Sequence, residues 1–413
     1  MSIGAAVEAG DLHDDAFARD PFPVWERLRH EAPLFHDTVD DVYLLTRYDD
    51  VAAVLADDVT YSTWIYKTWF GKVMGDTFAQ YDGERHGRER ARVAPHLVGG
   101  PLQRILQPVV AEVTDTILAA LPRDADLVGP FTFRLPGLVM AWLFGIRGPE
   151  QERFLRLAGE ISLGLVGGER ELAAGVAARH ELEEWTAERL EQRRRDGGTD
   201  DLLQWLIDPD AKGVVFEDEY VKTNVNFLAA AGSSTVDYAL RNVLWTIFAH
   251  PEHAMTAGDP EALEPVITEA LRFAPPVPYE GRIATTEVEW YGHTVPAGAI
   301  VRVALASATS DESVFADPRR FDPGRADLWA SDSRGGIHRD GAASHLAFGL
   351  GSHFCAGYKL SRLEAREGVA RLFRDRRPAL AEPLPPLRMH QYHLTIPSLR
   401  VALERGRHHR DLT

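Results

Sequence analysis

The chain has 413 residues, of which 45% are hydrophobic and 26% are charged, a balance typical of a soluble globular enzyme. Its formal net charge of −17 disfavours nucleic acid as a partner. The single cysteine, Cys355, excludes an intrachain disulfide framework. Residues 1–31 contain no signal peptide and no membrane-spanning run, so we expect a cytoplasmic protein with no membrane partner.

Helical patterns dominate the chain. Amphipathic segments predict helices over residues 21–33, from Asp49 onward, and over 169–196 up to the Gly197–Gly198 stop signal. The longest pattern covers residues 217–250, and one helix of this length would extend roughly 50 Å at 1.5 Å per residue. Its middle is almost free of charge, which predicts a helix that is buried on several sides.

Strand signals are few. Residues 287–292 and 294–305 alternate in the manner of strands, and they flank a turn near Gly292. No internal repeat and no linker interrupts the chain. We therefore predict a mainly α fold with small β-sheets, in a single domain over residues 1–413, with residues 1–20 and 404–413 as peripheral tails.

The segment HLAFGLGSHFCAG, residues 345–357, places Cys355 in a glycine-rich loop just before an amphipathic helix. The positive end of the helix dipole and the free backbone N–H groups there stabilise a thiolate over a thiol. Two other interpretations stay open at this point. One is a buried structural cysteine. The other is a zinc site made by His345, His353 and Cys355, which lacks an obvious fourth ligand.

The same segment resembles the haem-binding loop of the cytochrome P450 family, Phe-x-x-Gly-x-His/Arg-x-Cys-x-Gly. The fixed positions are filled by Phe348, Gly351, His353, Cys355 and Gly357. The resemblance implies that haem b lies between the long central helix and this loop, with the Cys355 thiolate as the iron ligand. It also implies that His353 binds a propionate and that Phe348 shields the sulfur. Gly349 lets the backbone approach the flat ring.

Two further segments match the family in the expected order. In EALRF, Glu269 and Arg272 stand at i and i+3 on one helix face, and FDPGR supplies Arg325. By the resemblance these three form a buried structural lock rather than a catalytic group. The connection from Arg325 to His345 looks longer than the family's usual one, and we assign it no function.

The haem propionates require cations. The segment DGERHGRER resembles the family's propionate-binding segment, with His86 and Arg90 four residues apart. Arg282, in YEGRIATTEVEW, stands where the family usually has another propionate arginine. The resemblance covers essentially the whole chain, from Pro21 to Leu403.

In the long helix, AAGSST resembles the family's oxygen-activating signature. Ala231 and Thr235 match this signature, whereas Ser234 replaces the usual acid. The resemblance implies that Thr235 helps to deliver protons to the bound oxygen and that Ala231 lies beside the haem. Without the acid, Asp237 can substitute, or water and substrate groups can complete the path, or the chemistry can depend less on ordinary hydroxylation.

The family places a variable loop over the active site before His86, so Trp64 and Trp69 are candidate contacts for a small organic substrate, of secondary-metabolite or aromatic and polycyclic type. Val277 and Tyr279 are further candidates because their segment follows the Glu269 helix. Basic residues cluster at 85–92 and 359–366 and suggest docking of an acidic ferredoxin.

We expect a haem-thiolate monooxygenase that uses O₂ and electrons relayed from NAD(P)H by a ferredoxin reductase and a ferredoxin. The alternatives are a P450-type enzyme of oxidative coupling and, in another class, a non-catalytic haem-binding carrier or sensor.

Overall fold

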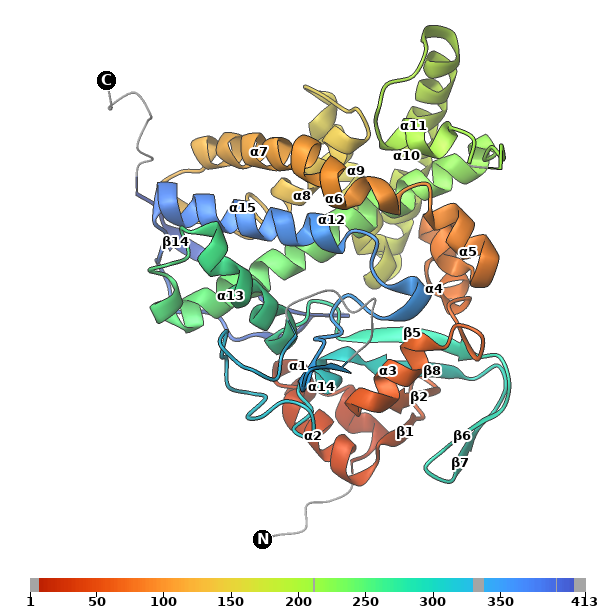
Figure 1. The fold of residues 1–413 in the computed structure, drawn as a ribbon, viewed down its shortest axis with the longest axis vertical. Helices are drawn as coiled ribbons and strands as arrows, with labels where there is room; N and C mark the ends of the chain where they lie inside the picture. The colour runs from red at the N-terminus through yellow and green to blue at the C-terminus, as the bar shows by residue number, and fades with distance from the viewer. Residues whose placement is uncertain (1–6, 211, 330–337, 391, 405–413) are drawn as a thin grey trace. The chain divides into compact units, whose positions relative to one another are not determined.

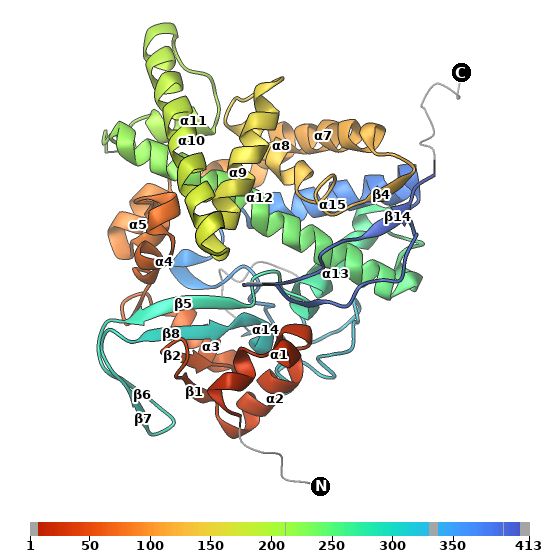
Figure 2. The same ribbon diagram turned by 180° about the vertical axis from the view of Figure 1, so that it is seen from behind.

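The computed structural model describes residues 7–210, 212–329, 338–390 and 392–404. Its contacts divide the chain into two compact units (Figures 1 and 2). Unit 1 comprises Met1–Ile65, Pro265–Cys355 and Pro385–Ile396, and unit 2 comprises Tyr66–Glu264, Ala356–Leu384 and Pro397–Thr413. The division into units does not test the prediction of a single domain over residues 1–413. Part of the long connection before His345, residues 330–337, and most of the C-terminal tail, residues 405–413, lie outside the described residues.

Unit 1 contains most of the strands. Its helices are η1 (Ala9–Leu12), α1 (Asp15–Arg19), α2 (Phe22–Glu31), α3 (Tyr48–Ala56), α14 (Leu305–Ala308) and η7 (Gly351–His353). Its strands are β1 (Leu34–Asp37), β2 (Val42–Leu45), β3 (Tyr61–Ser62), β5 (Tyr279–Ala284), β6 (Val288–Trp290), β7 (His293–Val295), β8 (Ile300–Ala304), β9 (His338–Arg339), β10 (Ala342–Ala343), β12 (Arg388–His390) and β13 (His393–Thr395).

The main sheet of unit 1 has the order β1-β2-β8-β5-β3, and α3 lies beside it (Figure 1). The β2–β8 pair is parallel, with Val42 opposite Ile300, and the other pairs are antiparallel. A core of buried residues from the sheet and α3 includes Tyr48, Val51 and Val303. The sheet thereby fixes β5, which carries Arg282 and Tyr279.

The predicted hairpin forms, but the second predicted strand divides into two. The β6–β7 turn contains Gly292 at φ 76°, as the sequence predicts. Residues 294–305 were predicted as one strand, and this is wrong because the chain turns between β7 and β8. Pro296 has no N–H for the ladder, and Gly298 has φ 85°, a conformation that glycine adopts readily.

Residues 7–20 are not only a tail. The ring of Phe17, on α1, is 6% exposed and packs edge-to-face on Trp25 of α2 at 5.7 Å. The expectation of a peripheral segment missed this contact because one buried aromatic residue is a weak signal in a polar sequence.

Unit 2 is mainly helical. Its longer helices are α5 (Gly83–Arg90), α7 (Gln107–Ala120), α8 (Arg134–Leu143), α9 (Glu150–Val166), α10 (Glu169–Asp196), α12 (Asp218–Ala249) and α15 (Tyr358–Arg376). Its shorter elements are η2 (Phe78–Gln80), η3 (Ala94–Leu97), α6 (Gly99–Pro101), η4 (Leu102–Leu106), α11 (Leu202–Ile207), η5 (Pro251–His253), β4 (Asp124–Asp126), β11 (Ala379–Leu380) and β14 (Arg400–Ala402). Two helices cross the boundaries of the units: α4 (Ile65–Met74) and α13 (Pro260–Phe273).

The long helix α12 is the centre of unit 2, and it matches the prediction for residues 217–250. Gly232 lets α8 approach α12, since a Cβ there would lie 2.5 Å from the sulfur of Met140. The α10 helix ends as predicted at Gly197, which has φ 89°. Within the described part of the chain, no helix combines the length and apolar character needed to cross a bilayer.

Candidate active site

The Cys355 loop lies in unit 1 and is built from tight backbone turns. The N–H of Cys355 donates to the carbonyl of Phe348 at 2.8 Å, and the N–H of Gly349 donates to Leu346 at the same distance. Gly349 and Gly351 have φ values of 71° and 72°. The loop therefore folds back on itself around Cys355, whose side chain is half-buried and not disulfide-bonded.

Gly351 is required where this loop meets α3. A Cβ at this position would lie 2.8 Å from the carbonyl oxygen of Leu55, closer than real Cβ contacts come. A hydrogen bond of 2.6 Å from Ser352 Oγ to Asp58 ties the loop to the same region. The ring of Phe348 packs on those of His345 at 5.6 Å and Phe354 at 6.4 Å. These contacts hold the loop in one conformation.

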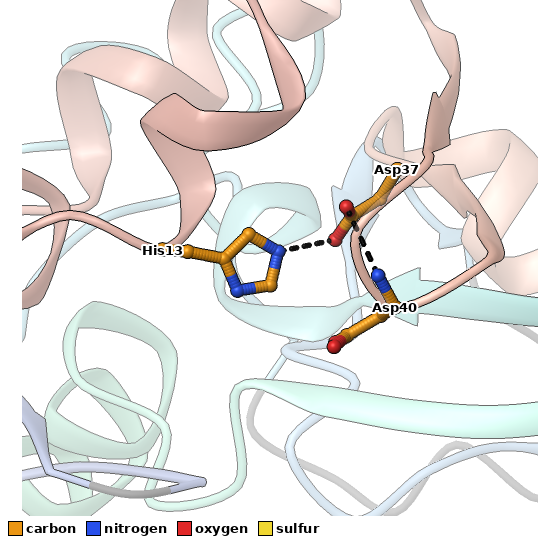
Figure 3. Close-up of side chains that lie close together, drawn as sticks. All are labelled: His13, Asp37 and Asp40. Carbon is orange, nitrogen blue, oxygen red and sulfur yellow. Dashed lines mark hydrogen bonds and ion pairs between the residues drawn. The ribbon is translucent and has the colours of Figure 1, made fainter.

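A zinc site at Cys355 is not supported. The His345 Nδ1 atom accepts the N–H of Ala347 at 3.2 Å. Over the described residues, the group whose ligand atoms converge closely enough for a metal is instead His13, Asp37 and Asp40 (Figure 3). There, His13 Nε2 lies 2.8 Å from Asp37, and Arg302 lies 2.8 Å from Asp40, so these atoms already form an ion-pair cluster.

Other predicted residues of unit 1 lie on and before β5. Arg282 is 3% exposed, and its Nη1 donates to the carbonyl of Gly281 at 2.7 Å. Val277 is half-buried, and the N–H of Leu394 on β13 donates to the carbonyl of neighbouring Pro276 at 3.4 Å, so β13 meets this segment. Trp64 is 43% exposed.

Tyr279 has a packing role. Its hydroxyl accepts a hydrogen bond of 2.9 Å from the indole N–H of Trp25, and burial raises the pKa of this hydroxyl. Its ring stands edge-to-face on Trp25 at 5.7 Å. These contacts favour a core residue over a substrate contact, because both the ring and the hydroxyl are already engaged.

The three residues predicted as a structural lock meet in unit 1. Glu269 Oε1 lies 2.7 Å from Arg272 Nη2 and 3.2 Å from Arg325 Nε. The side chains of Glu269 and Arg272 are fully buried, and that of Arg325 is 6% exposed. Arg272 also donates to the carbonyl of Thr309 at 2.7 Å, so its charge is fully partnered.

The oxygen-activating segment of unit 2 lies in the middle of α12, which is continuous α-helix there. The Ser234 hydroxyl donates to the carbonyl of Ala230 at 2.9 Å, and the Thr235 hydroxyl donates to Ala231 at 2.8 Å. Ala231, Ser234 and Thr235 stay half-buried on a helix whose neighbouring positions are buried. Both hydroxyl oxygens keep free lone pairs and can accept a proton from a donor beside the helix.

His86 and Arg90 lie on α5, with His86 2% exposed and Arg90 half-buried. The helix begins after Asp82 and carries Arg88 and Arg90 in the last turn, where cations suit the helix dipole. Trp69, on α4, is 36% exposed and stands next to Phe70 at 6.4 Å.

The expected basic surface is smaller than the sequence suggests. Arg92 is 6% exposed and donates to the carbonyl of Asp208 at 2.7 Å. Arg362 is paired with Glu264 at 2.5 Å, and Arg85 with Glu89 at 2.9 Å. Counting basic residues in sequence cannot separate such internal partners from exposed charge.

One residue of interest was not predicted. Glu364 on α15 is 1% exposed, and neither carboxylate oxygen has a hydrogen-bonding partner among the residues that the structure describes. Burial raises its pKa well above the usual range of a glutamate, because the charged form is disfavoured where water is excluded. Leu360, Gly368 and Leu372 stand at four-residue spacing around it. An acidic residue within this row of apolar positions was the sequence feature that could have predicted a buried glutamate.

The comparisons with known proteins agree on one family. The family model described as "Cytochrome P450" matches residues 261–398. Cytochrome P450 monooxygenase PikC of Streptomyces venezuelae is 30% identical over 388 residues, which cover 91% of this chain and 88% of that protein. The chain belongs to the cytochrome P450 family.

Other relatives and solved structures support the same assignment to the P450 family. The 6-deoxyerythronolide B hydroxylase of Saccharopolyspora erythraea is 30% identical over 397 residues, covering 90% of this chain and 92% of that protein. The crystal structure of CalO2 matches with a TM-score of 0.84 at 26% identity, covering 97% of this chain and all of that one. A mutant of P450 EryK with erythromycin B matches with a TM-score of 0.78 at 28% identity, covering 94% and 96%.

This P450 is therefore a haem-thiolate monooxygenase with the predicted mainly α fold. The family implies haem with a cysteine thiolate ligand, an organic substrate, O₂ and a supply of electrons. The residues present fit that cofactor. The chain offers one thiol, in a loop held by its own backbone, and buried cationic groups for carboxylates. This donor set suits a single axial thiolate better than a multi-ligand metal site.

Proposed function

We propose that this P450 oxidises a secondary metabolite, with haem b held by the Cys355 thiolate. The observation that carries this proposal is the Cys355 loop, whose Gly349 and Gly351 turns hold the single thiol half-buried. When bound, thiolate-ligated haem activates O₂ for transfer of one oxygen atom to the substrate. Phe348, within this loop, would shield the sulfur from water. His353, His86, Arg90 and Arg282 would hold the propionates.

Glu364 supplies the acid that Ser234 lacks. Asp237 is unsuited to this role because its carboxylate is bound to Arg241 at 2.9 Å. Burial raises the pKa of Glu364, and its carboxylate has no hydrogen-bonding partner among the described residues. The α15 helix packs beside α12, as the contact of Phe373 with Phe248 at 5.8 Å shows. The carboxyl group of Glu364 would hold the proton, and the hydroxyls of Ser234 and Thr235, which donate to the carbonyls of Ala230 and Ala231, would accept it and direct it towards the haem site.

The substrate class is suggested by the relatives. They include proteins named Erythromycin C-12 hydroxylase, Cyclomarin C epoxidase CymV and Epothilone C/D epoxidase. We infer that this enzyme takes a substrate of comparable bulk and apolar character. Half-buried Val277, exposed Trp64 and exposed Trp69 are the proposed contacts, because aromatic and branched side chains suit such molecules.

Electrons are supplied by an acidic ferredoxin with its NAD(P)H-dependent reductase. Arg88, with 39% of its side chain exposed, and exposed Lys359 are the proposed docking cations. Pairing between exposed charges weakens as salt rises, because the Debye length is about 8 Å at physiological ionic strength. The rate of electron transfer is thus expected to fall with added salt, and Arg88→Glu is expected to slow it further.

The proposal is tested by a ligand screen followed by turnover. Macrolides, cyclic peptides and polycyclic aromatics are titrated against the ferric protein, with haem absorbance as the signal of water displacement from iron. Ligands that bind are then incubated with surrogate ferredoxin, reductase and isotopically labelled O₂. We expect a product with one labelled oxygen atom. A product formed without labelled oxygen, or no spectral response to any of these classes, would contradict the proposal.

A further inference from the structure

One face of α12 carries residues that hold α5 as well as residues of the oxygen-activating segment. Tyr220, Asn224, Phe227, Ala231 and Thr235 recur every three or four residues, and such positions form a single stripe along a helix. Tyr220 contacts α5, which carries His86, and the next two contact Phe78 of η2, which precedes α5.

The first contact is between Tyr220 and Glu89. The hydroxyl of Tyr220 donates a short hydrogen bond to Glu89 Oε2, and Arg85 Nε donates to the other carboxylate oxygen at 2.9 Å. Glu89 is 3% exposed, although it lies on a helix rich in exposed charge. Burial raises the pKa of the Tyr220 hydroxyl, so Tyr220 keeps its proton and stays a donor.

The second set of contacts runs through Phe78. Its backbone N–H donates to Asn224 Oδ1 at 3.2 Å, and its ring stands edge-to-face on Phe227 at 5.3 Å. The other side of the ring faces His86, with the two rings 6.4 Å apart and inclined by 29°. The His86 ring thus rests on a phenylalanine that α12 holds in place.

We propose that Tyr220 and Glu89 are a positioning pair, which sets the place of α5 on α12 and thereby aims His86 and Arg90 at the haem propionates. The Tyr220–Glu89 hydrogen bond holds α5 one turn away from His86, whereas Phe78 packs directly on the His86 ring. Both attachments start from the stripe that leads to Ala231 and Thr235. This inference rests on the proposed function, in which His86 and Arg90 bind the propionates.

The variants separate the hydrogen bond from the charge. Tyr220→Phe removes the donor alone, and Glu89→Ala removes the acceptor. Glu89→Gln keeps an amide oxygen for the tyrosine hydroxyl and loses the charge pairing with Arg85 and Arg88, whose side chains are 44% and 39% exposed. Ion pairs with such solvent-exposed arginines contribute little. Glu84→Gln on the same helix is the matched control, because Glu84 is 81% exposed.

The readouts are the rate of haem transfer to apomyoglobin and the midpoint potential of the haem iron. We expect Tyr220→Phe and Glu89→Ala each to speed haem loss by about tenfold, the effect of about 1.4 kcal/mol, and to shift the potential. Glu89→Gln is expected to keep the rate of haem loss and the midpoint potential close to those of the unmodified protein. The double variant Tyr220→Phe/Glu89→Ala is expected to match Glu89→Ala alone, because the Tyr220–Glu89 hydrogen bond is already absent in Glu89→Ala.

The positioning role is overturned if both single variants match Glu84→Gln in haem loss and midpoint potential, even where their unfolding free energy falls. The ferrous–CO spectrum of the unmodified protein separates the two proposals. A thiolate-type spectrum with unaffected variants removes only the positioning role. A protein that takes up no haem removes the proposed function and this inference with it.

Discussion

Asp237 and Arg241 form an ion pair one turn apart on α12, with Arg241 Nε 2.9 Å from Asp237 Oδ1 and a second bond from Nη2 to Oδ2. Asp237 is 3% exposed, so this pair accounts for both of its oxygens in a buried setting. The acid nearest to Ser234 in sequence therefore has a structural role. Because Asp237 is held by Arg241, we propose Glu364 rather than Asp237 as the proton source.

Asp237→Asn should weaken the helix without disturbing oxygen chemistry. Loss of a buried charged partner costs about 1–3 kcal/mol, which urea unfolding would register. The ratio of product formed to O₂ consumed should stay at the level of the unmodified enzyme. A fall in that ratio with unchanged stability would show that Asp237 does supply protons.

Glu364→Gln should lower the ratio of product to O₂ consumed by several-fold, since an amide cannot release a proton to the hydroxyls of Ser234 and Thr235. Adding Ser234→Asp should restore the ratio, because it places an acid at the usual position of the family. The control is Ser234→Asp alone, which should change the ratio little. An unchanged ratio in Glu364→Gln would remove Glu364 from the proton path.

The same glutamate should make stability depend on pH. Burial raises the pKa of Glu364 above its ordinary value of 4.5, so above that pH the folded protein holds this proton more tightly than the unfolded chain does. Unfolding then releases a proton, so the free energy of unfolding falls as pH rises, by up to about 1.4 kcal/mol per pH unit.

Glu364→Gln removes this dependence. Its stability advantage over the unmodified protein should therefore grow from pH 5 to pH 8 in urea unfolding. Glu112→Gln, at an exposed glutamate of α7, is the control and should run parallel to the unmodified protein. Parallel curves for Glu364→Gln as well would show that Glu364 is already ionised in the fold.

Glu269→Ala should be among the most destabilising substitutions in unit 1. It leaves Arg272 buried without its carboxylate, at a cost of about 3–5 kcal/mol. Arg325→Ala should cost less, because Glu269 keeps its bonds of 2.7 Å to Arg272. Arg320→Ala, with 71% of that side chain exposed, is the control and should change the unfolding free energy by less than about 0.5 kcal/mol. Equal effects of Glu269→Ala and Arg320→Ala would contradict the lock.

Long, strongly patterned features were predictable from sequence. The α12 helix, the Gly197 end of α10 and the meeting of Glu269 with Arg272 depend on local periodicity or on a specific motif. The turn after β7 was missed because Pro296 and Gly298 interrupt a segment that otherwise alternates like a strand.

The remaining differences between the sequence predictions and the structure come mainly from contacts between residues far apart in the sequence. The sequence could not show that Arg92 would bind the carbonyl of Asp208, that Tyr279 would pack on Trp25, or that Asp237 would be held by Arg241. Each of these polar groups looked free in sequence. Burial and pairing depend on the tertiary structure, so the roles of isolated charged residues were the least predictable part of the site.

The central claim is that Cys355 ligates haem iron as a thiolate, and the ferrous–CO absorbance spectrum tests it most directly. We expect the long-wavelength Soret band of thiolate-ligated haem in the unmodified protein, and the shorter-wavelength band of histidine-ligated haem in Cys355→His with haem retained. A histidine-type spectrum in the unmodified protein, or the same spectrum in both, would contradict the account.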